Sequence, residues 1–495
     1  MNSQTKTSPA GDEPEAYPTR WLALVVMMAA NFMNLLDVTI VNVALPSLQG
    51  DLGADSSQIE WVVAGYVLVF ALGLLPFGRW GDVKGKKRAL LLGISFFTLA
   101  SALCGIAANI EILVLSRFIQ GAAAALMTPQ VLAIAQVMFP PKERAAAFSL
   151  FGLSAGLASV SGPIIGGWLI GMNFFDLGWR PIFLINIPIG IVAVILGTRL
   201  IPAIPAKPGQ RNDFVGIAIA ASGIFCIIFP LVEGRGFGWP AWCFVMVAAA
   251  LPLFFAFYQW ECRQNARGGP ELLPVSLMRN STYVVGALMT AIFFSSLPGF
   301  FLIFAMFLQS GFGLTPLQSG LTTMPFSVGV FFASIISGRI GNIAPRTRIA
   351  IGVVMVFVGM LALRFVVQDF SDSIERTHML PFLLLAGLGL GIAIAPMFQL
   401  VLAGVPPHDA GSGSGALQAI QQMGSVFGIA IVSQIFFSHL EGALGSGIAQ
   451  HAAYIDSFSL GLIYNFAAYT LVLIAVLLLK QKHPVDAVAV PVVHD

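Results

Sequence analysis

The sequence Asn-Phe-Met-Asn-Leu-Leu-Asp-Val-Thr-Ile-Val-Asn-Val-Ala-Leu-Pro, residues 31–46, lies within the first long apolar segment of the chain. A carboxylate, Asp37, stands near its centre, in a segment long enough to cross a bilayer. An ionisable group at that depth is costly unless it is protonated, paired or exposed to water. The stretch therefore predicts a membrane-spanning helix with a polar face.

That polar face is narrow. At about 100° per residue, its four polar side chains fall within an arc of about 140°. They are Asn31, Asn34, Asp37 and Asn42. The stripe is expected to face the interior of a helical bundle. One explanation is a buried polar contact between helices. The other is a functional ion or proton site, because intramembrane charges mark transport pathways.

The composition of the whole chain is that of a polytopic helical membrane protein. Of its 495 residues, 57% are hydrophobic and 10% are charged, with a mean hydropathy of +0.87. A soluble domain has about 25% charged residues. The net charge of +2 gives no sign of nucleic-acid binding, because the basic residues are spread among loops. The four cysteines show no metal-ligand spacing and indicate neither a disulfide framework nor a metal site.

Fourteen stretches are long enough to cross a membrane, which takes about 20 apolar residues. Their approximate bounds are 21–46, 58–78, 88–108, 111–138, 145–171, 180–202, 214–232, 240–260, 282–308, 318–340, 348–367, 379–402, 413–438 and 457–480. An even number of spans places both termini on the same side. The predicted fold class is all-α, polytopic and membrane-embedded.

The basic residues indicate which side that is. Of the 25 Lys and Arg residues, 20 lie in tails and loops on the side of the N-terminus. Three lie on the opposite side (Arg180, Arg235 and Arg376), and Arg117 and Arg364 lie within spans. By the positive-inside rule, the sequence predicts a multi-pass protein of the cell (inner) membrane with both termini cytoplasmic.

An internal repeat divides the chain. The second span ends in Gly-Arg-Trp-Gly-Asp (78–82), and the tenth ends in Gly-Arg-Ile-Gly-Asn (338–342). Spans 1–6 thus match spans 9–14, with two inserted spans between them. The expected parts are a tail (1–20), a six-helix half (21–202), a linker with two inserted helices (203–281), a second half (282–480) and a tail (481–495). Two parallel six-helix halves resemble the organisation of major facilitator transporters.

The loop after the second span makes this resemblance specific, because it is similar to the cytoplasmic gate motif of that superfamily. The motif residues are Gly78, Arg79, Gly81, Asp82, Gly85 and Arg88. Asp82 is expected to pair with Arg88 or Arg144, or to lie at a helix N-terminus where the dipole favours an anion. The alternative is an ordinary basic loop that only sets the topology.

The fourth span contains an arginine followed by Gln-Gly, residues 117 and 120–121, which resembles the proton-coupling motif of the family. At about 1.5 Å per residue, Arg117 and Asp37 lie about 9 Å and about 13 Å from the outer ends of their helices. The two charges are therefore expected to meet. The expected proton-coupling and cavity residues are Asp37, Arg117, Asn34, Asn42 and Gln120. An arginine snorkelling to the outer interface is the alternative.

The fifth span resembles the motif that marks antiporters within the superfamily. Its residues are Gly152, Gly156, Gly162, Pro163, Gly166 and Gly167. Small residues permit close helix packing and a proline permits a kink. A purely packing role for this motif is the alternative.

Residues 36–46 closely resemble the first-helix motif of the fourteen-helix drug:proton antiporters, the EmrB/QacA branch. Together the motifs cover spans one to five, and the repeat extends the resemblance over the chain. There are departures: span ten has no carboxylate, Asn342 replaces the acid of the second loop motif, and span thirteen carries only glutamines at 418, 421 and 422. With one deep carboxylate, dications are expected to be poor substrates.

The resemblance implies a proton-coupled secondary antiporter, not an enzyme, that exports hydrophobic or cationic drugs and toxic compounds and confers multidrug resistance. The proton gradient would drive it without a cofactor, and the sequence has no phosphate-binding Gly-rich loop with Lys-Ser/Thr. The expected partners are small hydrophobic or cationic substrates, protons and the lipid bilayer, with a periplasmic adaptor and outer-membrane channel in a Gram-negative cell, and no nucleic acid. The alternative is a dedicated exporter of a single metabolite, antibiotic or siderophore on the same scaffold.

Overall fold

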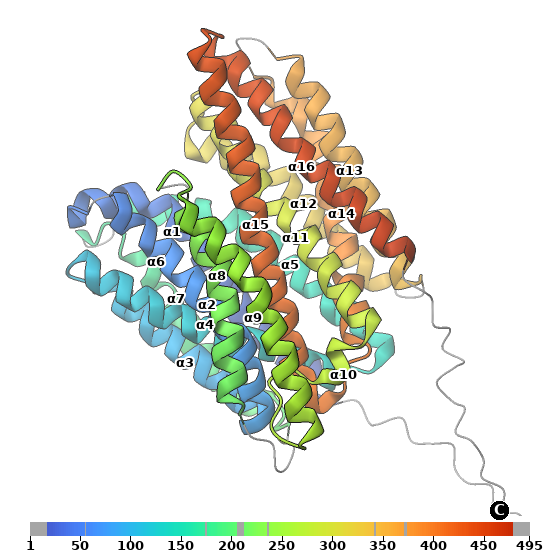
Figure 1. Cartoon of the computed structure of the whole chain (residues 1–495). Coiled ribbons are helices and arrows are strands. Elements are labelled where there is room, and N and C mark those ends of the chain that lie inside the picture. The colour runs from blue at the N-terminus through green and yellow to red at the C-terminus, as the bar shows by residue number, and fades with distance from the viewer. Residues whose placement is uncertain are drawn as a thin grey trace, which may run out of the picture.

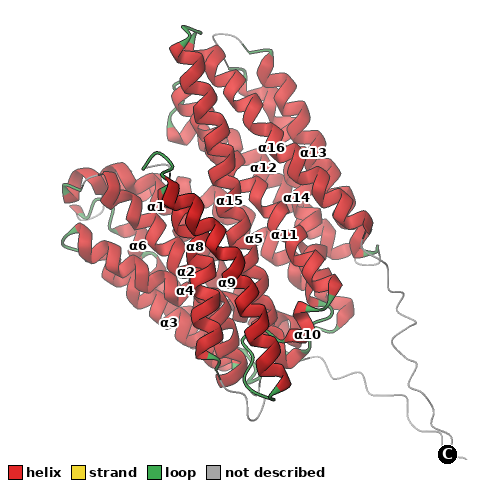
Figure 2. Ribbon diagram, viewed as in Figure 1, coloured by secondary structure: helices red, strands yellow, loops and turns green. Residues whose placement is uncertain are grey.

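The computed structural model describes residues 17–54, 56–173, 176–204, 212–234, 237–340, 343–370 and 374–478. Within these ranges every regular element is a helix (Figure 2). The first half of the chain contains α1 (Arg20–Leu52), α2 (Ser56–Lys84), α3 (Lys86–Gly105), α4 (Ile110–Met138), α5 (Pro141–Met172), α6 (Pro181–Leu184) and α7 (Asn186–Leu200). The insert contains α8 (Phe214–Glu233), α9 (Ala241–Ala266) and α10 (Val275–Met278). The second half contains α11 (Ser281–Met306), α12 (Pro316–Arg339), α13 (Pro345–Gln368), α14 (Arg376–Leu402), α15 (Ala410–Gly445) and α16 (Gln450–Leu478).

The described residues include 13 helical segments long and apolar enough to cross a membrane. Helix α5, with 32 residues, is also of membrane-spanning length, which is consistent with the predicted fourteen spans. Several helices are longer than the predicted spans; α15, for example, has 36 residues. Hydropathy marks only the part of a helix in the hydrocarbon core, whereas the helix itself continues into the interface.

Short polar side chains fix where several helices begin. Asn109 accepts a hydrogen bond from the Ile112 N–H at the start of α4, and Asn280 caps α11 in the same way. Thr315 and Gln318 form a reciprocal capping box at the start of α12. These caps satisfy backbone donors that have no partner within the helix.

The two halves form separate bundles that pack against each other (Figure 1). Helix α2 packs on α15, while α5 packs on α12 and α14. The inserted helices α8 and α9 pair with each other, and α8 lies against α2 and α15. The insert therefore covers one side of the junction between the halves without entering either bundle.

We call the end of the bundle where α1 begins and α16 ends the basic end. Side-chain hydrogen bonds join the two halves there. The Gln136 side chain of α4 donates to the backbone oxygens of Leu402 and Val405, at 2.7 and 3.1 Å. The Ser414 hydroxyl of α15 donates to the Pro129 oxygen of α4 at 2.8 Å. Towards the opposite end the halves diverge (Figure 1), so the molecule is closed at its basic end.

Candidate functional site

Asp37 of α1 and Arg117 of α4 form an ion pair in the interior of the first half. An Nη1 atom of Arg117 lies 2.5 Å from Oδ2 of Asp37, and the exposed fractions of the two side chains are 1% and 0%. The contact confirms the pairing expected from the depths of these residues in their helices. Two opposite charges this deeply buried stabilise each other only when their remaining polar atoms are also satisfied.

Those polar atoms are satisfied by Gln120 of α4 and by groups from two further helices, α7 and α2. The Gln120 side chain donates to Oδ1 of Asp37 at 2.8 Å and accepts from Arg117 at 2.7 Å. Asn186 of α7 donates to the same Asp37 oxygen at 3.3 Å. The Arg117 Nε group donates to the Val62 backbone oxygen of α2 at 2.8 Å. These contacts tie α1, α2, α4 and α7 together around the Asp37–Arg117 pair.

Ser101 and Asn186 belong to this network but were not predicted. Ser101 accepts from Gln120 at 2.9 Å and from Asn186 at 3.3 Å. A single small polar residue in an apolar span carries little signal, because it is also common at plain helix contacts. Asn186 had a weak signal, since it is an amide at the start of the sixth span.

Tyr66 of α2 separates the ion pair from the central cavity. The Arg117 guanidinium carbon lies 4.3 Å from the centre of the Tyr66 ring, a cation–π contact. The Tyr66 hydroxyl donates a hydrogen bond to the side-chain oxygen of Asn34. Tyr66 therefore touches the charged network with its ring and a residue of the cavity wall with its hydroxyl.

The cavity itself lies between the two halves and has a volume of about 300 Å³. Helices α1, α2, α4 and α5 line it from the first half, and α11, α14 and α15 from the second. Asn34 lines the cavity as predicted, whereas Asp37, Arg117 and Gln120 lie outside its lining. The side chain of Asn42 lies outside the described residues.

The described lining contains no Asp, Glu, Lys, Arg or His. Its polar groups are mainly carboxamides, from Asn31, Asn34, Gln418, Gln421 and Gln422. Its aromatic groups are Tyr66, Phe70, Phe151, Phe294 and Phe398. The cavity is thus aromatic and neutral, with hydrogen-bonding groups on both halves.

The carboxylate of Asp82, at the end of α2, holds the N-terminus of α15. It accepts from the Gly411 N–H at 2.9 Å, the Ser412 N–H at 2.7 Å and the Ser412 hydroxyl at 2.9 Å. Of the partners expected for Asp82, the helix N-terminus is correct. This contact closes the basic end between the two halves.

The expected cationic partners of Asp82 are wrong. The cation is Lys86, whose Nζ lies 2.7 Å from Asp82. Gly85 breaks the helix with φ of 99°, a conformation that favours glycine, and places Lys86 at the start of α3 beside Asp82. Arg88 is exposed, and Arg144 donates to the Phe139 backbone oxygen instead.

The remaining residues of this motif bring helices into close contact. A Cβ atom at Gly78 would lie 2.5 Å from the Gly411 backbone oxygen, and one at Gly81 would lie 2.1 Å from the Gln130 side-chain oxygen. Arg79 lies 3.7 Å from the Asp409 carboxylate, just before α15. The motif therefore fits α2 tightly against α15 and α4.

The glycines of α5 form a packing seam. A Cβ at Gly152 would lie 2.9 Å from the Ser334 hydroxyl, and one at Gly156 would lie 3.1 Å from Val330, both on α12 of the other half. A Cβ at Gly162 would lie 2.1 Å from the Thr39 hydroxyl of α1. Gly166 is buried, Gly167 faces open space, and the Pro163 side chain lies outside the described residues.

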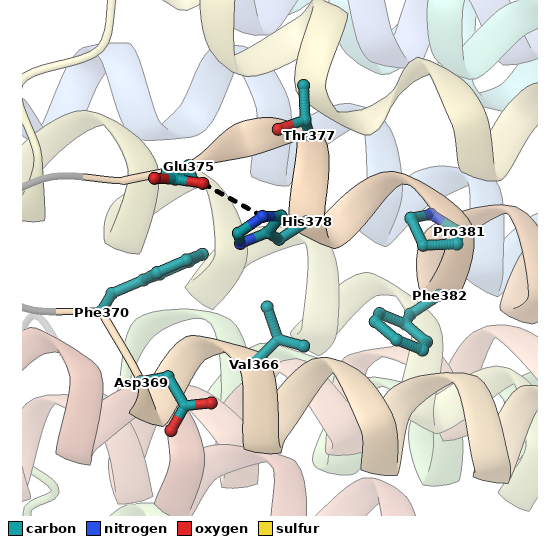
Figure 3. Close-up of a pocket in the computed structure, with 8 residues that line it drawn as sticks. All are labelled: Val366, Asp369, Phe370, Glu375, Thr377, His378, Pro381 and Phe382. Atoms are coloured by element: carbon teal, nitrogen blue, oxygen red, sulfur yellow. Dashed lines mark ion pairs between the residues drawn. The ribbon is translucent and has the colours of Figure 1, made fainter.

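Another hollow, of about 580 Å³, lies between the adjacent ends of α13 and α14 (Figure 3). Its ion pair joins Glu375 and His378 at 3.0 Å, but both side chains are more than 60% exposed. Exposed pairs of this kind contribute little energy. The hollow belongs to the second half, away from Asp37 and Arg117, and we assign it no role.

The two-bundle fold, the cavity between the bundles and the buried charge network define a membrane transporter. The chain belongs to the Major Facilitator Superfamily, whose family model matches residues 27–429. This confirms the superfamily that the motifs indicated.

Two curated relatives and one solved structure illustrate the match. The chain is 41% identical over 434 residues to the probable actinorhodin transporter of Streptomyces coelicolor, covering 88% of this chain and 74% of that protein. It is 32% identical over 475 residues to the puromycin resistance protein pur8 of Streptomyces alboniger, covering 93% and 90%. The crystal structure of the human organic anion transporter MFSD10 (TETRAN) matches with a TM-score of 0.64 at 15% identity, covering 93% of this chain and 100% of that one. That structural likeness shows the shared fold.

Proposed function

We propose that the protein exports small apolar molecules across the cell membrane in exchange for protons, with Asp37 as the proton carrier. The observation that carries this proposal is the Asp37–Arg117 pair, which is fully buried and is linked to the cavity wall through the contact of Arg117 with Tyr66. The puromycin and actinorhodin relatives, named for resistance and transport, support export as the direction of transport.

The charge distribution supports the orientation. Of the 25 Lys and Arg residues, 20 lie on the side of the N-terminus, and the positive-inside rule assigns that side to the cytoplasm. The basic end is then cytoplasmic, so the bundle is closed to the cytoplasm and opens outward. In this state an exporter has released its substrate and awaits a proton.

Protonation of Asp37 from outside starts the return step. With Arg117 engaged, the carboxylate is stabilised by an opposite charge and by the amides of Gln120 and Asn186. A proton removes the charge, and Arg117 keeps only its neutral contacts, including those to Val62 and Tyr66. The Asp37–Arg117 interaction between α1 and α4 therefore weakens, and the helices of the first half can rearrange.

Tyr66 and Asn34 link this event to the cavity. A substrate that hydrogen-bonds to Asn34 competes with the Tyr66 hydroxyl for its side-chain oxygen. Tyr66 then shifts against the guanidinium that it contacts. Substrate and proton thus bias the same two-state element in opposite senses, as exchange requires.

The cytoplasmic gate must open in the inward-facing state. Its closure here depends on Asp82, which caps the N-terminus of α15 and pairs with Lys86. Separation of the halves breaks the three hydrogen bonds to α15 together. The gate is therefore either closed or open, and intermediate degrees of opening are unfavourable.

A second candidate is export of a single compound. It is favoured by one observation, the 41% identity to a relative named for actinorhodin alone. A susceptibility panel with the gene deleted separates the two candidates. Broad sensitisation supports multidrug export, and sensitivity to one compound supports the dedicated exporter.

Proton coupling is tested in inverted membrane vesicles acidified inside. Addition of a compound from the panel should dissipate the pH gradient in vesicles with wild-type protein and leave it unchanged with Asp37→Asn. Equal dissipation by both proteins would contradict the proposal.

A further inference from the structure

We infer that the central cavity binds neutral, planar aromatic compounds bearing carbonyl and hydroxyl groups, in preference to lipophilic cations. The inference rests on the proposed export function and names the substrate class of that same cavity. It departs from the cationic substrates that the sequence motifs imply.

The first argument is charge. The described lining contains no carboxylate, and Asp37 is fully buried beyond it, already paired with Arg117. A cation in the cavity would lose water without gaining a counter-ion, which is unfavourable in apolar surroundings. The face of the Tyr66 ring, which attracts cations, is already occupied by the Arg117 guanidinium. A neutral ligand avoids this penalty.

The second argument is hydrogen bonding. Gln418 lines the cavity, is only 9% exposed, and its Nε2 group has no hydrogen-bond partner among the described residues. A buried donor without a partner is unfavourable, and a carbonyl oxygen of a ligand would satisfy it. Gln421 and Gln422 follow one turn later and line the same cavity. Carboxamides both donate and accept, so they suit carbonyl and hydroxyl groups together.

The third argument is shape. Phe294 of α11 and Phe398 of α14 stack with ring centres 6.3 Å apart and planes 26° apart. Tyr66 and Phe70 of α2 stack at 6.0 Å with planes 12° apart. Both pairs line the cavity, from opposite halves. Flat ring systems pack well against such surfaces, and about 300 Å³ suits a compact one.

The test compares two planar three-ring probes that differ in charge. Acridone is neutral and carries a carbonyl and an N–H, whereas 10-methylacridinium is a permanent cation on the same skeleton. Fluorescence titration of the purified full-length protein should give acridone an affinity at least about tenfold higher, the order of one buried hydrogen bond or unpaired charge. Equal affinities, tighter binding of the cation, or no binding of acridone would overturn the inference.

Two substitutions at Gln418 localise the effect. Gln418→Leu removes the unpaired donor and should weaken acridone binding about tenfold without changing 10-methylacridinium. Gln418→Glu supplies the missing anion and should shift the preference towards the cation. Gln434→Leu is the matched control, because Gln434 lies on the same helix but bonds to Trp239 outside the cavity. An unchanged affinity ratio in Gln418→Glu would contradict the assignment.

The export function is tested separately, by measuring proton release when compounds from the susceptibility panel to which the cells are resistant are added. If those compounds drive proton release that Asp37→Asn abolishes while acridone does not bind, the substrate class is wrong and the export function stands. If acridone binds as expected but no compound moves protons, the export function fails and the cavity assignment stands.

Discussion

The Arg117 guanidinium meets the Asp37 carboxylate at 2.5 Å in the interior of the first half, beyond the wall of the cavity. The carboxylate is therefore not a direct counter-ion for substrate. Arg117, which pairs with Asp37, contacts the Tyr66 ring, and the Tyr66 hydroxyl donates to Asn34; Tyr66 and Asn34 both line the cavity. Coupling between substrate and proton must accordingly act through a change in these contacts.

Tyr66→Phe separates the two contacts of Tyr66. The ring over Arg117 remains, but the hydrogen bond to Asn34 is lost. Substrate binding should persist with about tenfold or smaller loss, the range for one hydrogen bond, while substrate-induced proton release falls sharply. Wild-type proton release from Tyr66→Phe would rule out the hydroxyl as the link.

Asp82→Asn should weaken the gate at the basic end. The amide keeps one acceptor oxygen but loses the charge that faces the α15 N-terminus and Lys86, a loss of about 1–2 kcal/mol. We expect lower transport, and faster hydrogen exchange at 410–414, in a folded protein. Arg88→Gln is the control, because Arg88 is exposed. Full transport and unchanged exchange in Asp82→Asn would mean that the loop only sets topology.

Gly162→Ala and Gly167→Ala form a matched pair on α5. A Cβ at Gly162 would lie 2.1 Å from the Thr39 hydroxyl, whereas one at Gly167 would meet nothing within 4 Å. Overpacking costs about 1–3 kcal/mol, so Gly162→Ala should lower the melting temperature and transport. Gly167→Ala should leave both unchanged. Equal effects would show that close packing is not what α5 requires.

The orientation predicts cytoplasmic reporters at both termini and an external hairpin between α15 and α16, near 442–451. Fusions at the N-terminus, at the C-terminus and within this hairpin measure it. Termini on opposite sides of the membrane would contradict the fourteen-span arrangement.

Some contacts follow from local geometry and others do not. The Asp37–Arg117 pair was predictable because helix rise converts residue counts into depth. The partner of Asp82 on α15 lies 330 residues away, beyond any local pattern. Lys86 was missed because its position depends on the break at Gly85. Tyr66 was missed because one aromatic residue in an apolar span resembles ordinary packing.

The fold was more predictable than the site for the same reason. Span number follows from hydropathy, and the repeat follows from two similar loops, at 78–82 and 338–342. The cavity depends on side chains from seven helices of both halves. Their convergence is a tertiary property that residue spacing along one helix does not encode.

Asp37 as the proton carrier is the central claim, and substitutions at both charges bear on it. Asp37→Asn mimics a permanently protonated residue and should abolish accumulation against a gradient. Arg117→Ala leaves Asp37 buried without its cation and should also stop the cycle. Arg117→Lys keeps the charge but loses the guanidinium contacts to Gln120 and Val62, so partial function is expected.

The most direct measurement is proton release from purified protein in detergent when an exported compound is added, recorded over a range of pH. Wild-type protein should release protons at pH values where Asp37 is protonated before the compound binds, and Asp37→Asn should release none. If Asp37→Asn still releases protons and still pumps uphill, Asp37 is structural and the coupling site lies elsewhere.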